Sequence, residues 1–160
     1  LEFRRVLFRS PVALAGLAAL ALLVLAGCYS FAQPSFHPGT SRQLLLAIGR
    51  RGVAVEALAG ESACGDPTLV ANALHLRASV ASDPVVRDVW IYGFREKGWD
   101  ATKAPVDACQ AVYAAANPGR TITRLDIPVW RAFGADWSVE LTNAIRDGLT
   151  EAADLGATAN

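Results

Sequence analysis

The sequence contains no methionine, and it has only two histidines and three cysteines among 160 residues. His37 and His75 each lack a second histidine or cysteine at the spacing that zinc sites use, so we expect no metal site. No glycine-rich loop leads into a predicted helix, which argues against a phosphate-binding cofactor site. We therefore expect a protein without metal or cofactor.

Excess charge of one sign is also missing. The 15 basic and 15 acidic residues are scattered, without an arginine run or an acidic tail. Nucleic-acid binding requires clustered lysine and arginine to neutralise phosphates, so we expect no nucleic-acid partner. Three of the arginines and one glutamate lie within residues 1–27, which leaves the rest of the chain with a net charge near −2.

The first ten residues, LEFRRVLFRS, resemble the translation of a short-read sequencing adapter at every position. The absence of methionine agrees with this interpretation, and we expect the native start of the chain to be missing. The alternative is the basic n-region of a signal peptide, which Arg4, Arg5 and Arg9 would also fit. We interpret residues 1–10 as an artefact and leave them out of the fold.

Residues 11–27 contain only Pro, Val, Ala, Leu and Gly and carry no charge. As a helix this run would be about 25 Å long, which is less than the roughly 30 Å of a bilayer core. No basic cluster of the kind that stops membrane transfer follows it. The pattern predicts the h-region of a signal peptide, and an uncleaved single-pass anchor is the alternative.

The apolar run ends in Leu25-Ala26-Gly27-Cys28, which resembles the lipobox of bacterial lipoproteins. The resemblance implies a diacylglyceryl group on the Cys28 thiol, cleavage before Cys28 and a palmitate-bearing lipid anchor. Residues 28–39 then form a short tether. We expect the membrane to be a partner through lipidated Cys28, with the protein at the extracytoplasmic face of the cell membrane or envelope.

Two cysteines remain once Cys28 is assigned to lipid. An even number of cysteines in an exported chain predicts a disulfide, here between Cys64 and Cys109. The alternatives are two buried free thiols or a redox pair, although the two residues lack the C-x-x-C spacing that tunes redox dithiols.

The remaining pattern predicts a single α+β domain over residues 40–156 and a disordered tail at 157–160. We expect the order α-β-β-β-α-β-α, with about four mostly antiparallel strands. The simplest packing of such elements has two layers, with the helices on one face of the sheet.

Local signals place these elements. Thr40 and Gln43 have the spacing of a capping box, and Gly52 is typical of a helix end. Alternation of apolar residues predicts strands, and the second and third of these are expected to form an antiparallel hairpin. The expected strands are 53–58, 72–80, 87–96 and 120–127, and the later helices are expected to begin at Pro105 and after Ser138.

Catalytic patterns are weak. Residues 60–65, GESACG, only partly match a nucleophile elbow, because Cys64 stands where the second glycine is required. A hydrolase site built from Ser62, His75 and an aspartate is the enzymatic alternative, but the aspartates occur singly in turns and caps. We expect no catalytic residues and therefore a protein that is not an enzyme.

Aromatic residues and an arginine gather in residues 128–137, PVWRAFGADW. Tryptophan, tyrosine and arginine are enriched at binding hot spots, so the cluster is a candidate recognition surface. The alternative is that these rings pack the sheet against the last helix. The candidate surface consists of Trp130, Arg131, Phe133, Trp137, Trp90 and Tyr92.

Taken together, these patterns predict an exported, lipid-anchored bacterial protein that acts as a binding or envelope-accessory module. One alternative is an envelope hydrolase or thiol-redox enzyme. The other is an accessory subunit that keeps residues 11–27 as a single membrane span.

Overall fold

The computed structural model describes residues 40–58, 61–94 and 99–157, all of which belong to the compact unit Ser35–Asn160. The predicted leader at 11–27, the tether at 28–39 and Cys28 lie outside the described residues, and so does the end of the predicted tail. These assignments stay predictions.

Five strands form one sheet in the spatial order β1-β2-β3-β5-β4. Every neighbouring pair is antiparallel, and the predicted hairpin is the β2–β3 pair. The strands are β1 (Val53–Leu58), β2 (Ala73–Val80), β3 (Asp83–Gly93), β4 (Ile122–Ile127) and β5 (Trp130–Ala135).

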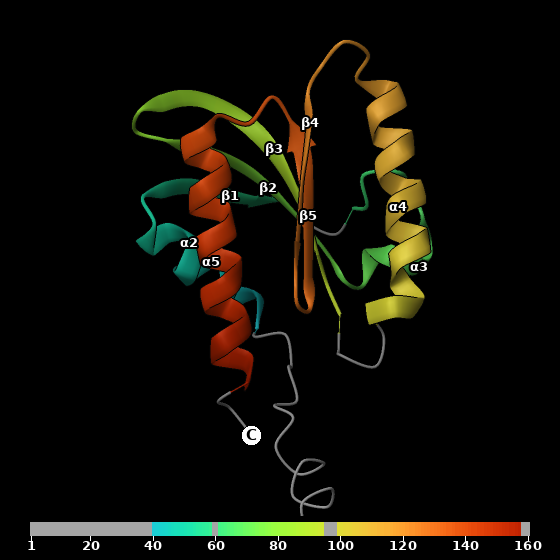
Figure 1. Cartoon of the computed structure of the whole chain (residues 1–160), viewed down its shortest axis with the longest axis horizontal. Helices are drawn as coiled ribbons and strands as arrows, with labels where there is room; N and C mark the ends of the chain where they lie inside the picture. The colour runs from blue at the N-terminus through green and yellow to red at the C-terminus, as the bar shows by residue number, and fades with distance from the viewer. Residues whose placement is uncertain (1–39, 59–60, 95–98, 158–160) are drawn as a thin grey trace, which may run out of the picture. The chain divides into compact units, whose positions relative to one another are not determined.

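Helices cover both faces of this sheet, with α2 and α5 on one side and α3 and α4 on the other (Figure 1). The α+β class is confirmed, but the prediction that the helices lie on one face is wrong. The cause lies in the central strands, because β3 is apolar on both faces over residues 89–92 and each face must be covered there. The helices are α2 (Ser41–Arg50), α3 (Pro67–Val70), α4 (Trp99–Ala116) and α5 (Val139–Ala157).

The core between the sheet and α2 with α5 is called the α5-side core here. It is mainly aliphatic, and the two helices approach each other closely at Gly148 of α5. A Cβ atom at Gly148 would lie 2.8 Å from Cγ1 and 2.9 Å from Cα of Ile48. Gly148 is therefore a packing site between the two helices. The main buried members are Leu44, Ile48, Leu76, Val89, Ile91, Leu125, Trp130, Trp137, Leu141, Ile145 and Leu149.

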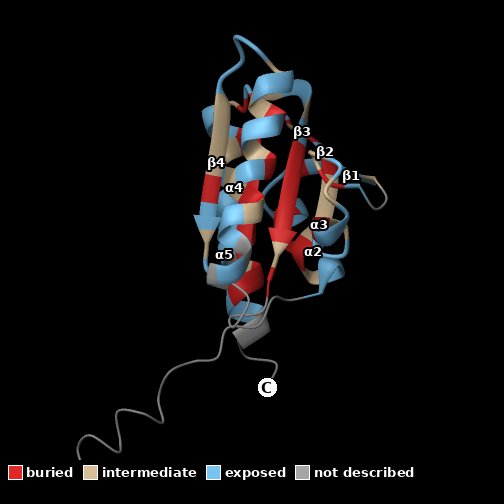
Figure 2. Ribbon diagram, turned by 90° about the vertical axis from the view of Figure 1, so that its right-hand side faces the viewer, coloured by how far each residue is buried: buried red, intermediate tan, exposed pale blue. Residues whose placement is uncertain are grey.

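The core between the sheet and α4 is called the α4-side core here, and it is rich in aromatic rings. Figure 2 shows this face, with the second half of β3 buried and the outer surface of α4 exposed. The rings of Tyr92 and Tyr113 lie 5.7 and 5.5 Å from that of Phe133. Its buried members are Leu69, Trp90, Tyr92, Phe94, Val106, Cys109, Tyr113, Phe133 and Ala135.

The fifth strand, β5, was not expected. It follows β4 after Pro128 and Val129, where Pro precedes a residue with φ of 63°. That is the pattern of a type II turn, which normally takes glycine at the second position. Because valine stands there, the sequence carries no ordinary hairpin signal.

Helix ends agree with the sequence at some sites and differ at others. The Thr40 hydroxyl accepts from the Gln43 backbone N–H at 3.2 Å, and the Gln43 side chain accepts from the Thr40 N–H at 2.8 Å, which confirms the capping box. Ser138 accepts from the Leu141 N–H at 3.2 Å and begins α5. The prediction that the preceding helix starts at Pro105 is wrong, because α4 begins at Trp99.

Candidate functional site

The predicted aromatic recognition surface is not a surface. Its six residues are 0–8 % exposed, and strand alternation divides them between opposite faces of the sheet. Trp130 and Trp137 belong to the α5-side core, whereas Trp90, Tyr92 and Phe133 belong to the α4-side core. The prediction of an exposed binding surface is therefore wrong, and the rings pack the sheet against helices on both sides.

Arg131 is the buried charge of that cluster. Its Nε lies 3.1 Å from Oδ1 of Asp126, which also accepts from Arg124. Arg124 reaches across to α4, where it contacts Asp107 and Gln110. A buried arginine requires such partners because desolvation of a lone charge is costly. This arrangement ties β4 and β5 to α4.

His75 and Asp88 form a polar pair on neighbouring strands. His75 Nε2 lies 2.9 Å from Asp88 Oδ1, and the imidazole stacks on the indole of Trp90 at 3.7 Å between centroids. The His75 side chain is 12 % exposed and that of Asp88 is 48 % exposed. Two of the three groups of the hydrolase alternative are therefore brought together.

The third group of that alternative, Ser62, is engaged elsewhere. Its hydroxyl donates to the backbone carbonyl of Asp66 at 3.1 Å and lies 4.0 Å from Sγ of Cys64. In this arrangement Ser62 holds the turn that leads into α3.

Cys64 and Cys109 have sulfur atoms 2.04 Å apart, so the predicted pair forms a disulfide in the structure. It links the loop between β1 and α3 to the buried side of α4. The Tyr92 hydroxyl lies 3.4 Å from Sγ of Cys109 and accepts from the Ala63 N–H at 3.1 Å. Burial raises the pKa of Tyr92 above its ordinary value.

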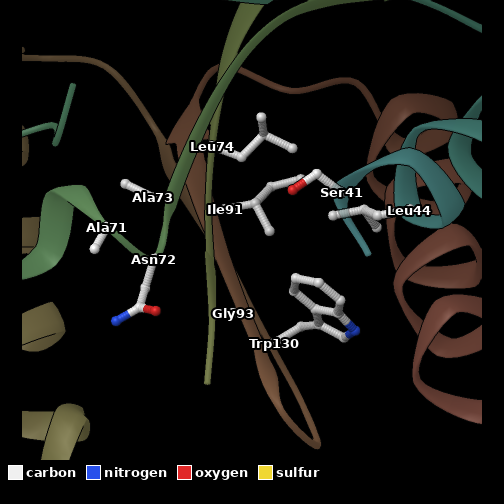
Figure 3. A pocket seen from close by; sticks show the side chains of 9 residues that line it. All are labelled: Ser41, Leu44, Ala71, Asn72, Ala73, Leu74, Ile91, Gly93 and Trp130. Carbon is white, nitrogen blue, oxygen red and sulfur yellow. The ribbon is translucent and has the colours of Figure 1, made fainter. Parts of the chain in front are cut away.

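A hollow opens at the end of the α5-side core, between the sheet and the start of α2. Its volume is about 180 Å³. Figure 3 shows the side chains of Leu74, Ile91 and Trp130 reaching from the sheet towards α2, and the Ser41 hydroxyl pointing back towards them. The lining residues are Ser41, Leu44, Ala71, Asn72, Ala73, Leu74, Ile91, Gly93 and Trp130.

The chemistry of this hollow is simple. Leu44, Ile91 and Trp130 give it a buried apolar floor, and the exposed Ser41 places a hydroxyl at its edge. The floor depends on Gly93, because a Cβ atom there would lie 2.5 Å from Cζ3 of Trp130. Sequence reasoning missed this site, since its residues come from α2, β2, β3, β5 and the segment before β2.

The described residues contain neither a metal-binding cluster nor a membrane-spanning helix. In residues 40–58, 61–94 and 99–157, no group of three or more His, Cys, Asp and Glu side chains is arranged to hold a metal ion. Over the same residues, no helix combines the length and the apolar character that a membrane span requires.

Fold and site together define a small α+β domain with the Cys64–Cys109 disulfide and, beside its first described helix, a hollow with an apolar floor. No protein-family model matches the chain, and comparison with curated proteins and with solved structures gives no match.

Proposed function

We propose that this chain is an exported, lipid-anchored protein whose α+β domain acts as a binding or envelope-accessory module. The observation that carries the proposal is the Cys64–Cys109 disulfide. Disulfides persist in oxidising compartments and are rare in the cytosol. A disulfide in the domain and a lipobox-like motif ahead of it therefore support the same location.

The anchor in this proposal is Cys28. Ser41, at the edge of the hollow, follows Cys28 by 13 residues. A tether of that length spans at most about 45 Å when fully extended. Lipidation of Cys28 would therefore keep the hollow near the membrane surface.

Binding at the hollow is the second part of the proposal. The hollow has a volume of about 180 Å³ and is open to solvent on one side, so it has room for one benzene-sized ring, which needs about 150 Å³. We infer that it takes one aromatic ring with a polar substituent, which would meet the Ser41 hydroxyl. Such a ring could belong to a free small molecule or to a tyrosine side chain of a protein.

The anchor is tested by Cys28→Ala in a bacterial host, with the n-region of a bacterial lipoprotein signal peptide fused ahead of residue 11. We expect the parent chain to incorporate radiolabelled palmitate and to enter the detergent phase, and the variant to do neither. Ser30→Ala, two residues away, is the matched control and should behave like the parent. Intact mass should place the mature N-terminus at Cys28; a mass that includes residues 11–27 would instead support the single-pass alternative.

The hollow is tested on the full chain labelled with fluorotryptophan, with p-cresol as the probe. Fluorine NMR should show a saturable shift of the Trp130 signal, assigned with Trp130→Phe, and no shift for Trp137 in the same core. Ser41→Ala should weaken p-cresol about fivefold through loss of one hydrogen bond, and leave toluene unaffected. Ser79→Ala is the control. Equal shifts of both signals would contradict a site at the hollow.

The source of the ring is distinguished by one further titration, with a tyrosine-containing peptide, on the same labelled chain. A tyrosine-containing peptide that shifts Trp130 at lower concentration than p-cresol would identify a protein partner. A weaker response to the peptide would identify a small molecule.

The hydrolase alternative rests on the His75–Asp88 pair. Ser62 would have to leave the Asp66 carbonyl and turn to His75 before it could act as a nucleophile. A fluorophosphonate probe decides between the two functions. Labelling that is lost in Ser62→Ala would support the hydrolase, and we expect no labelling of Ser62.

A further inference from the structure

The two sulfur atoms of the disulfide have different surroundings. Cys109 lies on the buried side of α4 and is 2 % exposed, within the α4-side core. Cys64 is only half-buried and stands beside the exposed Gly65, in the loop that leads to α3. A thiolate from solution therefore reaches the Cys64 side of the bond more readily than the Cys109 side.

The two sulfur atoms differ in their chemistry as well as in their exposure, because the Tyr92 hydroxyl lies beside only Cys109 of the two. The Ala63 N–H can only donate, so the Tyr92 oxygen is the acceptor in that bond. The hydroxyl proton is left to donate, and Sγ of Cys109 lies 3.4 Å from the same oxygen. Tyrosine keeps this proton at neutral pH at its ordinary pKa, and burial raises the pKa of Tyr92 further. A hydrogen-bond donor beside a sulfur atom favours its thiolate form.

We propose that Cys64 is the site of thiol–disulfide exchange, at which an external dithiol forms a mixed disulfide, and that Cys109 is the leaving group. The external thiolate attacks Sγ of Cys64, and a new S–S bond forms as the Cys64–Cys109 bond breaks. The electron pair passes to Sγ of Cys109, where the Tyr92 hydroxyl donates a hydrogen bond to the thiolate.

The second thiol of the dithiol completes the exchange. As a thiolate it attacks the partner sulfur of the mixed disulfide and releases Cys64 as a thiolate. The dithiol is then oxidised by two electrons and the protein disulfide is reduced by two, and both cysteine thiolates take protons from water. The reverse sequence forms the bond, so the mixed disulfide lies on Cys64 in both directions.

Tyr92 also keeps the opened site ready to close. Its hydrogen bond with the Ala63 N–H holds the loop at the residue that precedes Cys64. Cys109 belongs to the α4-side core and Cys64 packs against it, whereas the α5-side core contains neither cysteine. The partner defined by this chemistry is a dithiol of the kind that thiol–disulfide oxidoreductases carry.

The attacked sulfur is identified on the full chain with Cys28→Ser, which removes the third thiol. Brief exposure to reduced glutathione, acid quenching and peptide mapping should place the glutathione adduct on Cys64 at least about tenfold more often than on Cys109. The same treatment in denaturant should abolish the preference. An adduct mainly on Cys109, or an equal division in the folded chain, would overturn the proposal.

The leaving-group role is tested by Tyr92→Phe, which removes the donor and keeps the ring. Reduction by dithiothreitol at mildly alkaline pH should slow by about tenfold, because a hydrogen bond to a developing charge is lost. Tyr113→Phe is the matched control, a second buried tyrosine of the same core, and should leave the rate within about twofold. Equal rates for the two variants would overturn the role of Tyr92. Neither measurement depends on the lipid anchor or on the hollow.

Discussion

The α5-side core and the α4-side core lie on opposite faces of the same strands, and they are closed by different means. On the α5 side, two helices of 10 and 19 residues pack on the sheet and on each other. On the α4 side, one helix of 18 residues and the four-residue α3 cover the sheet. The disulfide and the Arg124–Asp107 contact are both on the α4 side.

The difference follows from the side chains that the helices supply. Leu141, Ile145 and Leu149 give α5 a continuous apolar stripe. Among the described side chains of α4, only Val106, Cys109 and Tyr113 are buried, and seven of the 18 positions of the helix are alanine. Apolar area stabilises at about 25 cal/mol per Å², so a helix with little buried area holds its place weakly. A cross-link compensates for that deficit by restricting the unfolded chain.

The largest expected effect is removal of the disulfide with Cys64→Ala and Cys109→Ala together. The two cysteines are 45 residues apart, and opening a loop of that size should lower the free energy of unfolding by about 4 kcal/mol. Urea unfolding measures the loss. Hydrogen exchange should accelerate in α4 and α3 more than in α2 and α5, and uniform acceleration across both faces would contradict the comparison.

A second prediction concerns the face without a cross-link. Ile145→Ala removes a fully buried side chain of α5 and should cost about 3 kcal/mol through lost burial and the cavity left behind. Leu46→Ala, at an α2 side chain that is 52 % exposed, should cost less than about 0.5 kcal/mol. Similar losses for the two variants in urea would mean that α5 does not close this core.

Contact between α2 and α5 is the subject of the third prediction. Gly148→Ala places a methyl group against the Ile48 backbone and should destabilise the fold by about 2 kcal/mol. Gly49→Ala is the matched control, because nothing lies within 4 Å of its Cβ position in α2. There alanine should stabilise by about 0.5 kcal/mol or more. Thermal unfolding of the two variants should shift in opposite directions.

Several elements could be predicted because their signals are local. The clean alternation of β2 placed Leu76 and Ala78 on one face, and both are buried there. The capping box at Thr40 depends on two side chains three residues apart. By contrast, β5 is buried on both faces, so it has no alternation, and its turn places Val129 at a position that usually holds glycine.

The two-sided covering of the sheet left a signal that the prediction did not use. Val89 and Ile91 alternate with Trp90 and Tyr92 in the second half of β3, so neither face is polar in that half of the strand. Such a strand cannot leave one face in water, and helices on both sides follow. The disulfide could be predicted because two cysteines remain once Cys28 is assigned to lipid. The contact of Tyr92 with Cys109, by contrast, depends on tertiary packing.

The hollow could not be predicted from the sequence, because it also depends on tertiary packing. Ser41 and Trp130 are far apart in the chain, and only the antiparallel register brings Gly93 opposite Trp130. No single segment carries the pattern. The hydrogen bonds of Asp136 with Arg120 and Thr121 could not be predicted either, because aspartate is common at turns and its presence there indicates no particular partner.

The smallest expected effect concerns Asp136, which joins the loop between α4 and β4 to the end of β5. Its carboxylate accepts from Arg120 Nε at 2.7 Å and from the Thr121 N–H at 2.8 Å, and these bonds lower its pKa. Because the pKa is lower in the folded state, the stabilisation is present above the unfolded value of about 4 and is lost as the pH falls through the folded value.

Asp136→Asn should therefore lower stability near neutral pH, and the difference from the parent should shrink between about pH 5 and about pH 2. Asparagine tolerates the φ of 55° at this position, so the backbone is retained. In an Arg120→Gln background the same substitution should have a smaller effect with a weaker pH dependence. A constant difference across this range would show that the Asp136 carboxylate does not stabilise the fold through its charge.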